Sequence, residues 1–485
     1  MRRLPEGLFA IGTADLHHNR YFVDGRGAMT SVVHEARVVG VGHGLDGEQE
    51  VIDVDAMDRA FILLGILASH EVFAAGNQRQ FGRGIGMHRD ANEDNAPELF
   101  DYTGGMKLET FALERFQSVW ENRVTWNVSE SGVHPLRVAD LVDTTALRDG
   151  LMEHELGYPQ TNGTGELRDL IAAIYPGATR EHVQVTNGGS EANFVVMTRL
   201  VQPGDEIVFM TPNYLQVSGL ARALGATVRP WPLQEIGSGE SARWAADTNL
   251  LNQLVTSSTR AIVLCNPNNP TGARIDSAVL QAVCEHAARV GAWVVGDEIY
   301  RGAERVADDT PSVWDQGYER TIVTSGLSKA YGLPGLRVGW VVGPPELINE
   351  LWAIHDYTTI APGGLSDRLA RIALTPERRT ALLARTRGII RSNYPLVTRW
   401  LEKQDGLSHI APEAGAILFA RHEHPYRSSE LAERLREERG VLVVPGDYCG
   451  MNGYLRIGFG SDPEYLAAAL TQIGEFLASV GLNAR

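Results

Sequence analysis

Six short apolar runs, separated by stretches with helical periodicity, constrain the fold of this chain more than any other feature. They are Glu206 to Met210, Ala226 to Trp231, Ala261 to Leu264, Ala292 to Val295, Thr321 to Val323 and Arg337 to Val342. Runs of this kind, alternating with helical patterns, are typical of a mostly parallel central sheet with helices on both faces. Ligands bind beyond the carboxyl ends of such strands, so we expect functional side chains there.

The segment from Ser325 to Trp340, SGLSKAYGLPGLRVGW, holds a lysine among small residues and an arginine eight positions later. A lysine amine can condense reversibly with the aldehyde of pyridoxal phosphate, whose ring accepts the charge left when an amino acid loses a substituent at Cα. Lys329 is therefore a candidate for the attachment site. The segment could also be a solvated surface turn, because Gly and Pro favour turns and Lys is usually exposed.

A phosphate-binding turn is indicated by TNGGSEAN, Thr186 to Asn193, which follows the apolar-rich stretch from His182 to Val185 and begins a helical pattern. A strand, a Gly turn and a helix start place free N–H groups and the positive end of the helix dipole together, which suits a phosphate. An ordinary strand-to-helix turn would give the same pattern.

Two of the apolar runs end in polar residues that suit a pyridine ring. Asn269, in NPNNPTG, offers an amide that could donate to a phenolate oxygen, and Asp297, in DEIY, could keep a pyridine nitrogen protonated. An Asn-Pro turn and a helix cap are the alternative interpretations.

These four segments and VVPGDYCGMNGYLRIGFG near the C-terminus, taken in order, resemble the class I/II aminotransferases, which are pyridoxal-phosphate enzymes of fold type I. The resemblance runs from about Met106 to about Val480. It implies an α/β fold with a large cofactor domain, a smaller α+β domain and, here, an N-terminal extension. The expected division is 1–105 for the extension, 106–160 and 346–485 for the small domain, and 161–345 for the large domain.

The resemblance implies which residues hold the ring of pyridoxal 5'-phosphate. Lys329 would attach the cofactor and later move a proton between Cα and the cofactor. Asp297 would face the ring nitrogen, and Asn269 and Tyr300 would hold the phenolate oxygen. Tyr214, in TPNY, would stack on the ring.

The phosphate, by the same resemblance, would be held by Gly189, Ser190 and the forked guanidinium of Arg337. Tyr158 would reach the phosphate of the neighbouring subunit, which implies a homodimer with shared active sites. One departure from the family pattern is Gly326, which stands where many members have a phosphate-binding Ser or Thr. Compensation could come from Ser325 or Ser328.

For the substrate, the resemblance implies that Arg456 grips the α-carboxylate as a planar fork, beside Asn269. The segment from Trp126 to Leu136 would bring backbone and small residues over the substrate, Gly132 among them. Glu130 in this segment could select the substrate side chain or could simply be a solvated carboxylate, as most Glu residues are.

The acidic composition excludes some classes of partner. A net charge of −16 argues against nucleic acids and anionic membranes, which select basic surfaces. FILLGILAS, 61–69, is too short to span a bilayer, and no secretory signal is apparent, so we expect a cytoplasmic protein. Three scattered cysteines predict neither a disulfide framework nor a metal site.

Residues 1–105 lie outside the resemblance. They contain nine Arg and no Lys against sixteen Asp and Glu, which argues against a DNA-binding domain. We expect a small mixed α/β cap or an extended arm, with no assigned role.

Three functions remain open on the sequence. An aminotransferase acting on an α-amino acid and a 2-oxo acid is favoured. Another pyridoxal-phosphate reaction of secondary metabolism, by a cyclase, lyase or oxidase, is the alternative, because the cofactor residues are shared and the geometry at Cα decides the outcome. A regulator without catalysis is disfavoured by the complete catalytic set.

Overall fold

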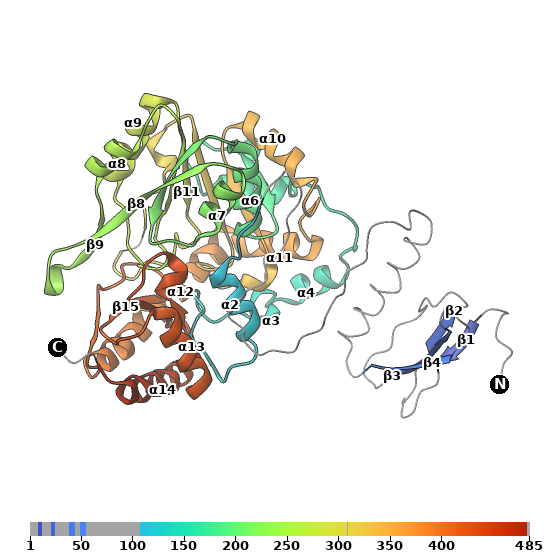
Figure 1. Cartoon of the computed structure of the whole chain (residues 1–485). Helices are drawn as coiled ribbons and strands as arrows, with labels where there is room; N and C mark the ends of the chain where they lie inside the picture. Colours follow the sequence, from blue (N-terminus) through green and yellow to red (C-terminus); the bar gives the residue numbers. More distant parts are fainter. Residues whose placement is uncertain are drawn as a thin grey trace, which may run out of the picture. The chain divides into compact units, whose positions relative to one another are not determined.

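A computed structural model of the chain describes residues 107–307 and 309–482 and four short strands near the N-terminus (Figure 1). The chain divides into two compact units, 1–94 and 95–485. In the first unit, the described strands form two antiparallel pairs: β1 (Leu8–Ile11) with β2 (Tyr21–Asp24), and β3 (Val38–His43) with β4 (Gln49–Val54). The apolar run 61–69 lies outside the described residues, and the role of residues 1–105 stays open.

The second unit is built on an eight-stranded sheet, and all six predicted strands belong to it. The strand order is β6-β13-β12-β11-β10-β7-β8-β9. Neighbouring strands from β12 to β8 are parallel, whereas β13 is antiparallel to both of its neighbours and β9 is antiparallel to β8. The strands are β6 (Val183–Thr186), β7 (Glu206–Thr211), β8 (Thr227–Ile236), β9 (Arg243–Ala246), β10 (Thr259–Cys265), β11 (Trp293–Asp297), β12 (Thr321–Gly326) and β13 (Gly339–Val342).

Both faces of the central strands are buried, as the unbroken apolar runs predict. In β7, Val208 and Met210 pack into one apolar core, and Ile207 and Phe209 pack into the other, because successive side chains point to opposite faces. The helices that contribute to the second core are α6 (Gly189–Leu200), α7 (Gln216–Ala223) and α10 (Pro345–His355). Those that contribute to the first include α5 (Gly165–Ala172), α8 (Thr248–Leu254), α9 (Ser277–Val290), α11 (Gly364–Leu374) and α12 (Pro376–Leu401).

One strand begins later than predicted. The run from Arg337 becomes a strand only at Gly339, because a 3-10 turn, Pro334–Leu336, precedes it and Arg337 itself adopts a left-handed conformation with φ of 49°. Arg337 therefore lies outside β13, and its side chain lines the cavity described below.

A second, antiparallel sheet has the order β14-β15-β18-β17 and packs with α13 (Ser428–Arg439) and α14 (Pro463–Val480). Figure 1 shows these helices and β15 at the opposite end of the second unit from α8 and α9. Its strands are β14 (Leu407–His409), β15 (Ile417–His422), β17 (Val444–Pro445) and β18 (Tyr454–Gly458). The proposed domain boundaries at 160/161 and 345/346 stay a prediction.

The segment 112–152 contributes short elements to the second unit. It contains α2 (Ala112–Trp120), β5 (Trp126–Asn127), α3 (Val138–Leu141) and α4 (Thr145–Met152). β5 pairs in parallel with β16 (Val441–Leu442). No helix among the described residues has the length and apolar content needed to cross a bilayer.

Glycine is required where β18 crosses the segment that follows β5. The Gly458 amide donates to the Val128 carbonyl at 2.7 Å, and a Cβ built on Gly458 would overlap the carbonyl oxygen of Glu130. The two backbones are therefore in direct contact, which fixes where residues 128–132 lie.

We predict that Gly458→Ala lowers the free energy of unfolding by roughly 1–3 kcal/mol, because a backbone must move to admit the methyl group. Gly388→Ala is the matched control: Gly388 lies inside α12 with open space around its Cα, so alanine should stabilise the helix by roughly 0.5–1 kcal/mol. Chemical denaturation measures both. Equal stability of the two variants would contradict the close crossing.

Candidate functional site

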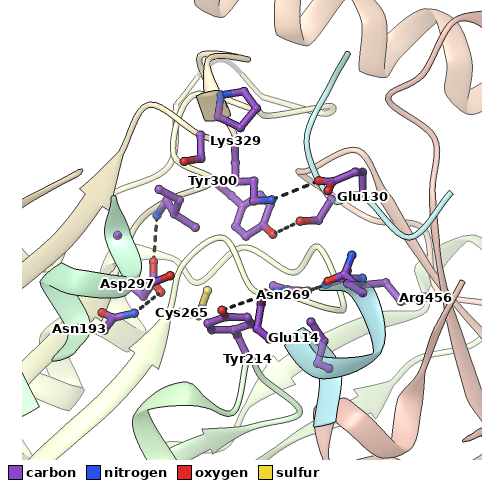
Figure 2. A pocket seen from close by; sticks show the side chains of 18 of the residues that line it. Glu114, Glu130, Asn193, Tyr214, Cys265, Asn269, Asp297, Tyr300, Lys329 and Arg456 are labelled. Carbon is purple, nitrogen blue, oxygen red and sulfur yellow. Dashed lines mark hydrogen bonds and ion pairs between the residues drawn. The ribbon is translucent and has the colours of Figure 1, made fainter. Parts of the chain in front are cut away.

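A cavity of about 300 Å³ lies where the loops after the parallel strands meet α2 and β18. It is lined by residues from each of the five segments that carry the family resemblance (Figure 2). The predicted residues that line it are Gly189, Ser190, Tyr214, Asn269, Asp297, Tyr300, Lys329, Arg337 and Arg456. Side chains far apart in the sequence thus converge because parallel strands present their carboxyl ends at one edge.

Lys329 follows β12, and its ammonium group lies 3.5 Å from a carboxylate oxygen of Glu130. The charge of Lys329 is the main cause of a lowered pKa at Glu130. Gly132 lies against the same lysine, since a Cβ built on it would be 3.5 Å from Lys329 Cδ. The structure therefore places both Glu130 and Gly132 beside the lysine. The Glu130 side chain is 53% exposed, so it lines the cavity while staying open to solvent.

Asp297 ends β11 on the side of the cavity opposite Arg456 (Figure 2). Its carboxylate accepts hydrogen bonds from the Ile299 amide at 3.1 Å and from the side-chain amide of Asn193 at 3.4 Å. Burial raises the pKa of Asp297, and no described basic residue forms an ion pair with it. A carboxylate in this state is a ready partner for a cationic ring nitrogen.

Arg456 is buried in β18, with 2% of its surface exposed. One terminal nitrogen donates to Asn269 Oδ1 at 2.8 Å and the other to the Ser129 carbonyl at 2.7 Å. Its Nε has no hydrogen-bond partner. A buried guanidinium without a carboxylate partner, facing a cavity, suits a carboxylate ligand.

Tyr300 is buried, and its hydroxyl donates to Ser131 Oγ at 2.7 Å. Burial raises the pKa of Tyr300, so its hydroxyl keeps its proton and acts as a hydrogen-bond donor. Because Asn269 accepts from Arg456 with its oxygen, its amide nitrogen stays available as a donor.

The turn before α6 forms a cradle with Arg337. Gly188 has φ of 92°, and a Cβ on it would overlap the Arg337 guanidinium. The N-terminus of α6, with Gly189 and Ser190, lines the cavity at this point. Free helix N–H groups beside a guanidinium form a strong anion site.

Gly326 cannot carry a phosphate-binding side chain here. A Cβ on it would lie 2.7 Å from the Val338 carbonyl oxygen. Ser325 does not compensate, because its hydroxyl is buried and donates to the Glu298 carbonyl at 3.2 Å. Ser328 does line the cavity, and Arg337 lies 3.4 Å from its hydroxyl.

Tyr214 follows β7 and is held by α2. Its hydroxyl donates to Glu114 at 2.7 Å, and its ring makes an edge contact with Phe111 at 4.8 Å between centroids. Tyr158 is different: it is 89% exposed and lies outside the cavity of its own chain. Its expected contact with a neighbouring subunit stays a prediction.

Several lining residues were not singled out from the sequence. Asn193 lies one helical turn after Gly189, so helix periodicity alone could have indicated it. Ser131 precedes Gly132 and gave no separate signal. A further group, on α2 and at its C-cap, carries no recognisable motif and consists of Leu113, Glu114, Gln117 and Glu121.

These residues fit pyridoxal phosphate. The unpaired Asp297 suits the ring nitrogen, the cradle of Gly188 and Arg337 suits the phosphate, and Lys329 and Arg456 line the same cavity. Asp297, Arg337, Lys329 and Arg456 already line the cavity in this structure.

Comparison with known proteins gives the same assignment. The sequence model of the family described as aminotransferase class I and II matches residues 138–473. Capreomycidine synthase of Streptomyces vinaceus is 34% identical over 73% of this chain and 90% of its own.

Two crystal structures are also similar. A pyridoxal-phosphate-dependent aminotransferase from Streptococcus suis has a TM-score of 0.72 and 30% identity, covering 78% of this chain and all of its own. The pyridoxal-phosphate-dependent cyclase OrfR has a TM-score of 0.69 and 28% identity, covering 77% of this chain and 98% of its own. The chain therefore belongs to the class I and II aminotransferases, and its cofactor is pyridoxal phosphate.

Proposed function

We propose that this enzyme transfers the amino group of an α-amino acid to a 2-oxo acid. The observation that carries the proposal is the convergence of Lys329, Asp297 and Arg456 on one cavity. An amine for proton transfer, a carboxylate for a ring nitrogen and a buried guanidinium for an α-carboxylate are the three groups that transamination requires.

Each residue has a defined task in this proposal. Pyridoxal phosphate, when bound, supplies an aldehyde that condenses with amines and a ring that accepts electrons from Cα. Gly189, Ser190 and Arg337 bind the phosphate, and Tyr214 packs on the ring. Asp297 holds a proton on the ring nitrogen. The amide of Asn269 donates to the ring oxygen, and the hydroxyl of Tyr300 does so once it turns from Ser131.

Arg456 binds the substrate carboxylate, and Gly132 lets the backbone of residues 129–132 pass close to Lys329. This arrangement orients the Cα–H bond toward the Lys329 amine. The amine then moves the proton from Cα to the cofactor. The buried wall formed by Ser131, Tyr300 and Arg456 keeps bulk water from the reacting carbon.

A second candidate is a cyclase or lyase reaction on the same cofactor. Two of the similar proteins, capreomycidine synthase and the cyclase OrfR, favour it. The position of Glu130 beside Lys329 also favours it, because a carboxylate there could act on a substrate atom beyond Cα.

A single-turnover half-reaction separates the two candidates. Holoenzyme mixed with one amino acid and no acceptor should convert its cofactor to the amino form and release one equivalent of 2-oxo acid. Lys329→Ala should slow this step by at least about 10²-fold, because the proton-transfer group is lost, whereas Lys403→Ala, at an exposed lysine, should not change it. Turnover that leaves the cofactor in its aldehyde form would contradict transamination.

We predict that Arg456→Lys weakens amino-acid binding by roughly 1–3 kcal/mol, because a planar fork is replaced by a single ammonium group. Arg399→Lys, at an exposed position of α12, is the control. Absorbance titration of the holoenzyme measures the dissociation constants. Unchanged affinity in Arg456→Lys would assign the carboxylate to another residue.

The proposed enzyme is a homodimer with shared sites. Large apolar side chains are exposed on two segments, Met152, Leu156 and Tyr158 on one and Tyr357 and Ile360 on the other. The first segment lies against the start of α11, since a Cβ on Gly364 would be 3.5 Å from the Gly157 carbonyl oxygen. The second is joined to the phosphate turn by hydrogen bonds from Asn187 to Thr359 and Ala361. The second of these exposed apolar segments therefore adjoins the phosphate turn.

We predict that cofactor retention follows dimerisation, because a ligand held by both subunits binds only the assembled state. Tyr158→Phe should weaken cofactor binding by roughly tenfold, the value of a charge-assisted hydrogen bond, and leave the dimer intact. Size-exclusion chromatography with visible absorbance measures both. A monomer that keeps its cofactor on dilution would exclude the shared site.

A further inference from the structure

Helix α2 forms an acidic wall of the cavity. One face lines the cavity with Leu113, Glu114 and Gln117 of the helix and with Glu121, the C-cap residue that follows it in helical conformation. Gln117 is buried and anchors this face, donating to the carbonyl of Ser129 at 3.2 Å and to its hydroxyl at 2.8 Å. Glu114 and Glu121 are therefore directed into the cavity by a fixed helix, not by a flexible loop.

Glu130 adds a third carboxylate to this wall. In Figure 2, Glu130, Glu114 and Arg456 lie on one side of the pocket, and Asp297 lies on the other. Glu114 is bonded to Tyr214, and Glu130 is paired with Lys329. The carboxylate of Glu121 has no hydrogen-bond or ion-pair partner among the residues that the structure describes.

These carboxylates repel one another. Burial, and after it the charges of Glu130 and Glu114, raise the pKa of Glu121. A cation between them would remove this repulsion. Once Lys329 acts on cofactor and substrate, as proposed above, its charge no longer compensates Glu130, and the basic residues left on the cavity wall are Arg337, at the phosphate cradle, and Arg456, at the carboxylate site.

A metal ion does not explain the wall. Within residues 107–307 and 309–482, no three acidic, His or Cys side chains are close enough to hold one. Carboxylates spread along a helix face and a neighbouring segment suit an extended organic cation instead. Arg456 supplies the independent sign of a ligand in the same cavity, because this buried residue lines the cavity and its Nε has no hydrogen-bond partner.

We propose that the amino acid bound at this site carries a second cation, an amine or a guanidinium, at the end of its side chain, and that Glu121 and Glu130 bind that cation. The inference rests on the proposed function, since it takes the α-carboxylate at Arg456 as the fixed end of the substrate. The substrate side chain then extends from Lys329 toward α2, where the carboxylates lie.

The position of these residues in the sequence fits a role in selectivity. Glu114, Glu121 and Glu130 all precede residue 138, where the match to the family model begins. Lys329, Asp297 and Arg456 lie inside the match. The cofactor residues are thus supplied by the matched part of the chain, and the acidic wall is supplied by the segment before it.

Pairs of amino acids that differ mainly in charge test the inference. L-Arginine and L-citrulline have nearly the same shape, and only arginine is cationic; L-lysine and L-norleucine form a second pair. Each is titrated into the holoenzyme, and the change in visible absorbance gives its dissociation constant. We expect at least one cation to bind about tenfold or more tightly than its neutral partner, the effect of a charge-assisted hydrogen bond.

The variant Glu121→Gln should reduce this preference to about threefold or less, because it weakens binding of the cationic amino acid and leaves binding of the neutral one unchanged. Glu319→Gln, at an exposed carboxylate before β12, should keep the full preference. Equal affinities within both pairs, or an undiminished preference in Glu121→Gln, would overturn the inference and leave the proposed function standing. Failure of all amino acids to change the absorbance of cofactor-loaded protein would overturn both.

Discussion

The buried guanidinium of Arg456 holds together the three parts of the chain that form the site. From β18 it reaches Asn269, in the loop after β10, and the backbone of Ser129, in the segment after β5. Removing a charge from water is expensive unless it is paired, and no carboxylate among the described residues pairs with it. The protein thus keeps a buried cation whose Nε has no hydrogen-bond partner among the described residues, which suits a site that a ligand completes. The close contact between Gly458 and residues 128–130 keeps the segment of Ser129 in place.

The cofactor side of the site could be predicted from the sequence because strand ends and cofactor residues coincide there. Apolar runs mark the parallel strands, and Asn269, Asp297 and Lys329 each follow one of them. Residues placed in this way have little freedom, since the sheet register fixes their neighbours. Arg456 could be predicted only through the family resemblance, because its distance from the other residues along the chain gives no local signal.

The substrate side could not be predicted in the same way. The sequence of α2 is that of an ordinary amphipathic helix. Nothing in it indicates that Glu114 and Glu121 line a cavity instead of the outer surface. Glu130 posed the same problem: most glutamates are solvated, and only the crossing of β18 places it beside Lys329. Gly326 shows the reverse case, where a missing side chain is explained by a backbone that packs too closely to admit one.

The proposed chemistry depends on Lys329 being the residue that bears the cofactor, and the small number of lysines in the chain makes this easy to measure. It contains three lysines, Lys107, Lys329 and Lys403, and of these only Lys329 lines the cavity. Borohydride reduction of the holoenzyme fixes the cofactor to its lysine, and mass spectrometry of the peptides locates the added mass. We predict one equivalent of added cofactor on the peptide that contains Lys329. Added mass at Lys107 or Lys403, or none at Lys329 in protein that carries cofactor, would contradict it.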